Sequence, residues 1–503
     1  MNIVEIVVFI LLWYIVFKIF GGVVGIILKL FGVVRDASLT TSFIDYPYLA
    51  IFLGVISYFI ARAVASIRII ETNPFVKKLK EQERKRRAVK VNHARYYREG
   101  KREGKVYIGY DRLNREGFFL DDETRTRHIH ILGSTGSGKS VLLFNIFKQD
   151  VEIGGAAIFI DAKGDIENLE RVRKIVREAG REKDLLIFRL DRESNTYNPL
   201  LLGNATQKKD KIISSIRWSE VYYERVSENI LQLLFTAVSK RITLKDLYNI
   251  LTTPTMIYEF SDGEKELACK EYINFCETHK REKTTLTSEI GLLVFSDFYK
   301  NLDTTEPEIN FFDCIRERKI LYFGIDVQSY QETSKRIGRI ITEEINTTSG
   351  IIQTQISERE RRYVSVIIDE FQAFGTENFI NCLSRGRSSR FMITIAHQSL
   401  ADLEIIKPGF SRQVIDNTYT KIVLPIQDPE TIQTIADIIG TYKEYEHTAE
   451  ITYSGPEPER EKGTVKLVDE YIIHPNDIRQ IRIGEAVYKS GRKAGIIQIP
   501  FKL

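Results

Sequence analysis

Short apolar runs alternate with amphipathic stretches over most of the chain from position 105 onward. Apolar runs that are separated by helical stretches are typical of a parallel sheet covered by helices on both faces. The candidate strands are 127–133, 154–161, 185–191, 320–326, 364–369 and 391–397. Two closing strands are expected at 484–499. The pattern therefore predicts an α/β fold.

The pattern changes between positions 205 and 311. Apolar side chains such as Val226, Ile230 and Leu234 recur there at helical spacing, and no strand alternation is present. We therefore predict an all-α subdomain at 205–311. It would be inserted into one α/β domain that consists of residues 105–204 and 312–503.

Two almost continuously apolar stretches, 3–34 and 46–61, precede the α/β part. Each approaches the roughly 20 residues that a helix needs to cross a bilayer. The basic run after the second stretch follows the positive-inside rule and places the rest of the chain in the cytoplasm. We therefore predict a two-pass transmembrane hairpin at 1–76. Lys18 leaves the start of the first span open, because a charge inside the bilayer is costly.

Charge is concentrated in one segment. The net charge is only +4, but positions 77 to 105 contain 13 Lys or Arg and 4 Asp or Glu. This basic neck, which we place at 77–104, predicts a contact surface for anionic lipid headgroups or for nucleic acid. Its position beside an apolar stretch favours anionic lipid. A solvated charged helix is the alternative.

A glycine-rich loop follows the first candidate strand, in the stretch "HILGSTGSGKSVLLF". It satisfies G-x-x-x-x-G-K-[ST], with a strand before it and a helix after it. In such a loop, backbone N–H groups and the helix amino terminus surround phosphate oxygens. The residues expected to bind the nucleotide are Gly133, Ser134, Thr135, Gly136, Ser137, Gly138, Lys139 and Ser140. Lys139 would reach the β- and γ-phosphates of ATP, and Ser140 would ligate Mg²⁺.

An acidic pair ends the apolar run in "VSVIIDEFQAF". Carboxyl ends of parallel strands lie beside the phosphate loop in such sheets, so both side chains are expected near the nucleotide. Asp369 would orient the Mg²⁺ shell, and Glu370 would polarise the attacking water. The sequence therefore predicts ATP hydrolysis with Mg²⁺.

Polar residues flank the candidate strand at 391–397. Gln398 follows this strand, where its amide could sense the γ-phosphate. The stretch "SRGRSSR" before the strand contains Arg385, Arg387 and Arg390. An arginine supplied in trans by a neighbouring subunit could stabilise the charge of the transition state. A solvated basic turn is the alternative, and the sequence does not choose among the three arginines.

With these motifs in order, the chain resembles the type IV secretion coupling proteins, which are conjugative DNA-transfer ATPases related to FtsK/HerA-type DNA pumps. The resemblance is carried by "HILGSTGSGKS", "IFIDAKGD", "YNPL", "ILYFGID", "VIIDEFQAFG" and "RGRSSRFMITIAHQSL". It implies a RecA-like fold, a hexameric ring and a motor in the bacterial inner membrane. By position, Arg387 matches the arginine proposed to act in trans, and Gln398 matches the sensor glutamine. Asp161 and Lys163 match the D-x-K-G motif.

Three functions remain open at this point. The first is an ATPase that moves relaxase-bound single-stranded DNA into a type IV secretion or conjugation channel. The second is an ATP-dependent receptor that delivers protein effectors, and the third is an ATP-binding membrane scaffold without hydrolysis. The implied partners are further copies of the chain, single-stranded or duplex DNA, a relaxase or other substrate protein, secretion-channel proteins, and anionic lipid at the neck.

Overall fold

The computed structural model describes residues 91–190, 194–452 and 459–502. The apolar stretches 3–34 and 46–61, and the neck up to residue 90, lie outside these residues. Within the described ranges, no helix is both long enough and apolar enough to cross a bilayer. The longest of them, α15 (Val327–Gln355), has six charged side chains between positions 332 and 344. The prediction of a two-pass inner-membrane protein is corrected on this finding and is not carried further.

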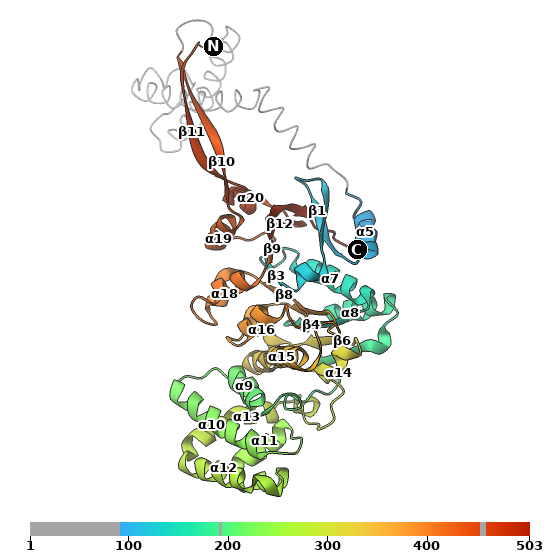
Figure 1. Cartoon of the computed structure of the whole chain (residues 1–503), viewed down its shortest axis with the longest axis vertical. Helices are drawn as coiled ribbons and strands as arrows, with labels where there is room; N and C mark the ends of the chain where they lie inside the picture. The colour runs from blue at the N-terminus through green and yellow to red at the C-terminus, as the bar shows by residue number, and fades with distance from the viewer. Residues whose placement is uncertain (1–90, 191–193, 453–458, 503) are drawn as a thin grey trace, which may run out of the picture. The chain divides into compact units, whose positions relative to one another are not determined.

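An 11-stranded sheet forms the centre of the described part (Figure 1). Its order is β2-β1-β13-β12-β9-β3-β8-β7-β4-β6-β5. The strands in chain order are β1 (Val106–Asp111), β2 (Glu116–Leu120), β3 (Ile129–Leu132), β4 (Ala156–Asp161), β5 (Leu185–Arg189), β6 (Ile320–Gly324), β7 (Val364–Ile368), β8 (Phe391–His397), β9 (Thr420–Val423), β12 (Glu485–Ser490) and β13 (Lys493–Gln498). The strands from β9 to β5 in this order are parallel, and the remaining pairs are antiparallel. The predicted α/β class is confirmed, and the six predicted strands are parallel; the seventh parallel strand, β9, was not predicted.

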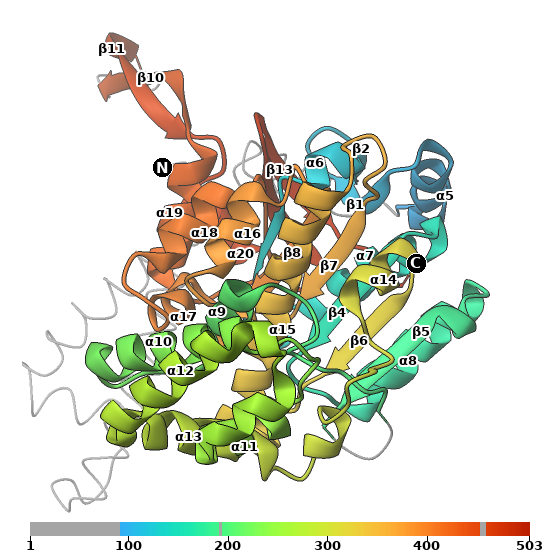
Figure 2. The ribbon, with the colours of Figure 1, turned by 60° about the horizontal axis from the view of Figure 1, so that its bottom comes forward.

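Helices cover both faces of the sheet (Figures 1 and 2). Successive side chains of a strand point to opposite faces, and β4 shows this clearly. Ile158 and Ile160 belong to the core beneath α15, α16 (Phe379–Arg385) and α18 (Phe410–Asn417). Phe159 belongs to the core beneath α7 (Lys139–Ile153) and α8 (Ile166–Glu178), where its ring stacks on that of Phe144. Because β4 is buried on both faces, it is apolar at every position but the last.

The chain between β5 and β6 is helical. It contains α9 (Ala205–Ser215), α10 (Val221–Ala237), α11 (Leu244–Thr252), α12 (Glu266–Thr278), α13 (Lys280–Val294) and α14 (Phe311–Arg316), together with short 3-10 turns. Apolar residues of these helices share one core with α15 and the sheet. A buried ion pair between Lys211 of α9 and Glu344 of α15 also joins the two parts. The limits of an inserted subdomain at 205–311 stay a prediction.

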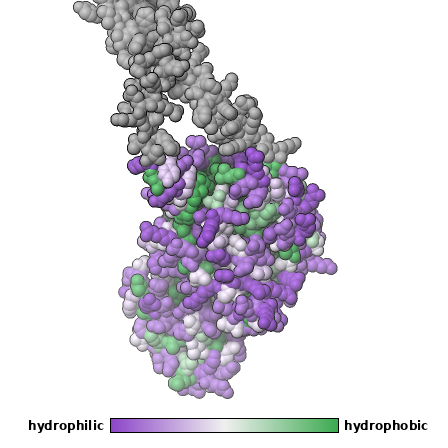
Figure 3. Space-filling view, turned by 45° about the horizontal axis from the view of Figure 1, so that its top comes forward, coloured by the Kyte–Doolittle hydropathy of each residue, from purple (hydrophilic) through white to green (hydrophobic). Residues whose placement is uncertain are grey.

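Several elements have no counterpart in the sequence prediction. The hairpin of β1 and β2 extends one side of the sheet, and β10 (Thr441–Thr452) and β11 (Glu459–Tyr471) form a separate two-stranded sheet. Further short helices are α6 (Asp122–Arg125), α17 (Leu400–Glu404), α19 (Pro429–Ile439) and α20 (Pro475–Gln480). The described end of the neck is α5 (His93–Glu103), which packs through Tyr96 on Tyr107 of β1. The face seen in Figure 3 is mainly hydrophilic, with apolar side chains in small groups.

Candidate nucleotide-binding site

The glycine-rich loop connects the carboxyl end of β3 to the first turn of α7. Gly136 and Gly138 have φ angles of 76° and 104°, which side chains with a Cβ rarely adopt. A Cβ on Gly133 would lie 2.5 Å from Ser137 Oγ, so this position is closed by packing. The Ser134 N–H donates to the carbonyl of Pro425 at 3.0 Å, which fixes the loop against the chain after β9. The loop is therefore anchored, and glycine is required where it turns.

Two polar side chains of the loop fit a phosphate ligand. Lys139 is 7% exposed, and its ammonium donates to the carbonyls of Gly133 and Ser134. Burial lowers the pKa of Lys139, although the nearby Glu370 and Asp369 act against this shift. Ser137 Oγ is buried and has no hydrogen-bond partner among the described residues. A buried hydroxyl without a partner is uncommon, and a phosphate oxygen would satisfy it.

The acidic pair lies at the carboxyl end of β7, which is separated from β3 by β8 alone. Asp369 is buried, and this burial, together with the charges of Glu370 and Asp161, raises the pKa of Asp369 to about 7. The Glu370 backbone is left-handed, with φ at 49°, and its N–H donates to Asp369 Oδ1 at 3.0 Å. The chain thus turns sharply between the two carboxylates. Bound Mg²⁺ would lower the cost of holding Asp369 ionised in this place.

Gln398 connects the loop with the acidic pair. It follows β8, the strand between β3 and β7. Its Nε2 lies 3.5 Å from Glu370 Oε2, and its Oε1 accepts a hydrogen bond from Thr135 Oγ1 at 3.3 Å. The strand order therefore brings together the phosphate loop, Glu370 and Gln398, which lie far apart in the sequence.

Arg387 lies away from this cluster. It precedes β8, whereas Gln398 follows it, and seven strand residues span roughly 20 Å. Its side chain is 63% exposed and lies 3.5 Å from Glu123 of α6. Arg390 instead donates to the carbonyl of Arg361, at 2.6 Å. The structure does not bring Arg387 to the phosphate loop of its own chain.

Asp161, in the D-x-K-G stretch, ends β4 beside β7. Its Oδ2 accepts hydrogen bonds from Tyr322 at 2.8 Å and from Asn168 at 2.9 Å. Its Oδ1 accepts the N–H of Lys163 at 3.0 Å. These bonds fix the turn after β4, and the Asp161 charge contributes to the raised pKa of Asp369.

Two contacts of the site were missed from the sequence. Gln372 Nε2 donates to Glu370 Oε2 at 2.8 Å. His130 of β3 and His397 of β8 are joined through their Nε2 atoms at 2.5 Å, and burial lowers the pKa of His397 to about 4. The available signals were the spacing of "DEFQ" for Gln372 and the histidine that ends β8. Neither signal identifies a contact partner.

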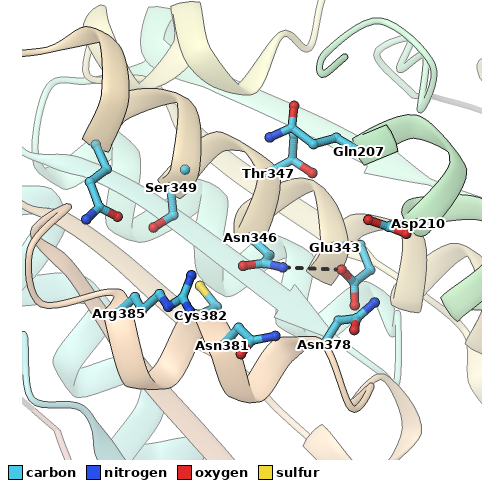
Figure 4. A pocket seen from close by; sticks show the side chains of 12 residues that line it. Gln207, Asp210, Glu343, Asn346, Thr347, Ser349, Asn378, Asn381, Cys382 and Arg385 are labelled. Carbon is cyan, nitrogen blue, oxygen red and sulfur yellow. Dashed lines mark hydrogen bonds between the residues drawn. The ribbon is translucent and has the colours of Figure 1, made fainter. Parts of the chain in front are cut away.

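A separate polar cavity of about 350 Å³ lies among α9, α15 and α16 (Figure 4). Its wall includes Glu343 and Asn346, which are hydrogen-bonded at 3.5 Å, and Arg385. The residues that line it do not include any member of the phosphate loop or of the acidic pair. Arg385 therefore borders a different site from the one at Glu370.

A family model described as the type IV secretion-system coupling protein DNA-binding domain matches residues 116–500. The chain is also similar to the type 4 coupling protein DotL of Legionella pneumophila, with 22% identity. This match covers 65% of the chain and 50% of DotL, so the chain spans about half the length of that curated relative.

Two solved structures share the fold. One is the unbound bacterial conjugative coupling protein TrwBdeltaN70, with a TM-score of 0.55 and 15% identity, which covers 80% of this chain and 91% of that one. The other is the plasmid coupling protein TrwB in complex with ADP and Mg²⁺, with a TM-score of 0.54 and 14% identity. This match covers 80% of the present chain and 92% of the TrwB chain.

Proposed function

Because the chain belongs to the type IV secretion-system coupling proteins, we propose that it is an ATPase that moves DNA, as a relaxase-bound single strand, into a secretion or conjugation channel. The observation that carries this proposal is the connection from Thr135 through Gln398 to Glu370. It joins a phosphate loop to a carboxylate suited to activate water. A protein that only binds ATP has no need of that carboxylate.

ATP with Mg²⁺ is the nucleotide ligand in this proposal. The related TrwB was solved with ADP and Mg²⁺. In this chain, the loop residues 133–140 would surround the phosphates, with Lys139 and Ser137 Oγ directed to phosphate oxygens. Ser140, in the first turn of α7, and Asp369 would hold Mg²⁺, which neutralises phosphate charge when bound.

Glu370 would act on the attacking water. The water oxygen forms a bond to the γ-phosphorus while its proton passes to the Glu370 carboxylate, and the bond to the β–γ bridging oxygen breaks to release ADP and phosphate. Gln398 would sense the γ-phosphate from the end of β8. Arg387 would stabilise the developing charge in a neighbouring copy of a homo-oligomeric ring, which we take to be a hexamer.

A receptor for protein effectors is the second candidate. Leu292 and Phe295, at the end of α13, are 59% and 73% exposed. Exposed apolar groups of this kind mark protein contacts when they gather in one place. A substrate protein or a secretion-channel protein would then bind the helical part, and hydrolysis would drive its delivery.

The test is ATP hydrolysis by the full chain with and without single-stranded DNA, over a range of salt concentrations. We expect DNA to stimulate hydrolysis, and the stimulation to fall with salt because phosphate contacts release counterions. Lys139→Ala should lower kcat by roughly 100-fold or more, since it removes a charge aimed at the transferred phosphate. Lys270→Ala, an exposed lysine of α12, is the control and should leave the rate unchanged.

The remaining outcomes separate the alternatives. Stimulation by a substrate protein but not by DNA would support the receptor. An assembled wild-type ring without any turnover would refute the ATPase and leave the scaffold.

A further inference from the structure

Two amide groups converge on one oxygen of Glu370. Gln372 Nε2 donates to Oε2 at 2.8 Å, and Gln398 Nε2 lies 3.5 Å from the same atom. The other oxygen, Oε1, accepts no hydrogen bond from the described part of the chain. The carboxylate is thus held from one side and open on the other.

The turn that presents Gln372 is costly in two respects. Glu370 has a left-handed backbone without being glycine, and the 3-10 turn η5 (Phe371–Ala373) follows at once. Gln372 Oε1 is buried and has no hydrogen-bond partner among the described residues. Left-handed non-glycine residues and unpartnered buried oxygens both lower stability and gather at functional sites. A role in holding Glu370 accounts for both costs.

The two glutamines differ in what else they touch. Gln398 is also bonded to Thr135 of the phosphate loop, so a γ-phosphate at this loop would compete for its amide. The only hydrogen bond of the Gln372 side chain within the described ranges is the one to Glu370. When nucleotide draws Gln398 away, Gln372 is the contact that remains.

We propose that Gln372 is a positioning residue that fixes Glu370 Oε2, so that Oε1 faces the water that attacks the γ-phosphate. This inference rests on the proposed ATPase function. Gln372 does not contact the nucleotide in this scheme, and Gln398 is the group that responds to the phosphate. Holding a general base in its productive geometry contributes to the rate without contributing to substrate binding.

The test replaces Gln372 with Met, which keeps the length of the side chain and removes its amide. In the full chain we expect kcat for ATP to fall at least about tenfold, while KM for ATP and Kd for ADP change less than about twofold. The melting temperature should not fall, because the variant also removes an unpartnered buried oxygen. A merely structural role would instead lower the melting temperature and weaken nucleotide binding together with the rate.

A double variant supplies the second measurement. In Glu370→Gln, the carboxylate that Gln372 holds is gone, so adding Gln372→Met should leave the residual rate unchanged. Gln372→Leu, also without an amide, repeats the experiment if the Met variant does not fold. A single Met or Leu variant with wild-type kcat, or a further loss of rate in the double variant, would overturn the role of Gln372. The wild-type rate is measured first. Absence of turnover in the wild-type chain would refute the proposed ATPase function itself, whereas the variants test only the role of Gln372.

Discussion

Glu343 is a carboxyl group buried inside the described part, in the middle of α15. Burial raises its pKa from the ordinary 4.5 to about 7, and Asp210 adds to the shift. Hydrogen bonds from Thr376 and Asn346 and the charge of Lys211 act against it. The folded state therefore binds the Glu343 proton more tightly than the unfolded state does.

The stability of the protein should consequently depend on pH at this residue. Between about pH 4.5 and pH 7 the folded chain keeps the proton and the unfolded chain releases it, so the free energy of unfolding decreases as pH rises. Glu343→Gln should raise the free energy of unfolding by roughly 1 to 3 kcal/mol at pH 8 and leave it nearly unchanged at pH 4. Thermal melting at the two pH values measures the difference.

The matched control is Glu358→Gln, which changes an exposed carboxyl group. It should show no such dependence on pH. A variant at Glu343 that is equally stable relative to wild type at both pH values would contradict the assignment.

At the residue level, the sequence predicts positions that are defined by spacing along the chain. Lys139, Asp369 and Glu370 are predicted in this way, because each follows a strand at a short distance along the chain. The contact of Gln372 with Glu370 was not predicted, since it depends on a left-handed backbone at a residue that is not glycine. The bond between His130 and His397 depends on strand order, which no local pattern contains.

Among the elements, α15 supports the turn that carries the acidic pair. Gly338 of this helix faces Phe374, which follows η5, and a Cβ on Gly338 would lie 2.1 Å from Phe374 Cδ1. Thr342 Oγ1 donates to the Phe374 carbonyl at 3.0 Å, one helical turn further along. The glycine allows the helix to approach the turn closely enough for this bond.

Gly338→Ala should therefore move the turn that carries Glu370. We expect a loss of roughly 1 to 3 kcal/mol in stability from overpacking, together with a lower rate of ATP hydrolysis. Gly350→Ala is the control in the same helix, because its Cβ would have its nearest contact at 4.0 Å, with Gln207 Nε2. It should be neutral or stabilising, since alanine favours a helix over glycine by about 1 kcal/mol. Equal melting temperatures for the two variants would show that the Phe374 side chain moves away from the added methyl group without loss of stability.

The elements differ in how far sequence predicts them. Six of the parallel strands were predicted because they are mainly apolar, and all of them except the edge strand β5 are buried at every position. The strands β10 and β11 were missed, since their polar and charged residues resemble those of a loop. The hairpin of β1 and β2 was also missed, because its place in the sheet depends on pairing with β13 at the far end of the chain.

At the scale of the whole molecule, the proposed function needs a second copy of the chain to complete the candidate site. The phosphate loop, Glu370 and Gln398 lie at the carboxyl ends of the parallel strands. Arg387 precedes β8 and lies at the amino end of that strand. In a ring with head-to-tail contacts, one surface of each copy contacts a different surface of the next copy. The surface that carries the phosphate loop would then contact the surface that carries Arg387. Arg387 would then complete the site of its neighbour, and hydrolysis would depend on assembly.

Mixing two inactive variants tests this arrangement. Lys139→Ala removes the phosphate contact, and Arg387→Ala removes the proposed trans arginine, so each variant alone should hydrolyse ATP slowly. In an equal mixture, about a quarter of the head-to-tail contacts would join an intact Lys139 to an intact Arg387 from the neighbouring copy. The mixture should therefore recover a substantial part of the wild-type rate, measured as ATP turnover at a concentration where rings form.

The control mixture combines Lys139→Ala with Glu370→Gln. Lys139 and Glu370 belong to the part of the site that a single chain supplies. Every site in that mixture therefore lacks one of the two residues, and no recovery is expected. If Arg385→Ala is inactive and complements Lys139→Ala in place of Arg387→Ala, the role belongs to Arg385 at the rim of the α15–α16 cavity. Wild-type turnover by Arg387→Ala would exclude Arg387 from the trans role. Wild-type turnover by all three of Arg385→Ala, Arg387→Ala and Arg390→Ala, or turnover independent of protein concentration, would place the whole reaction within a single chain.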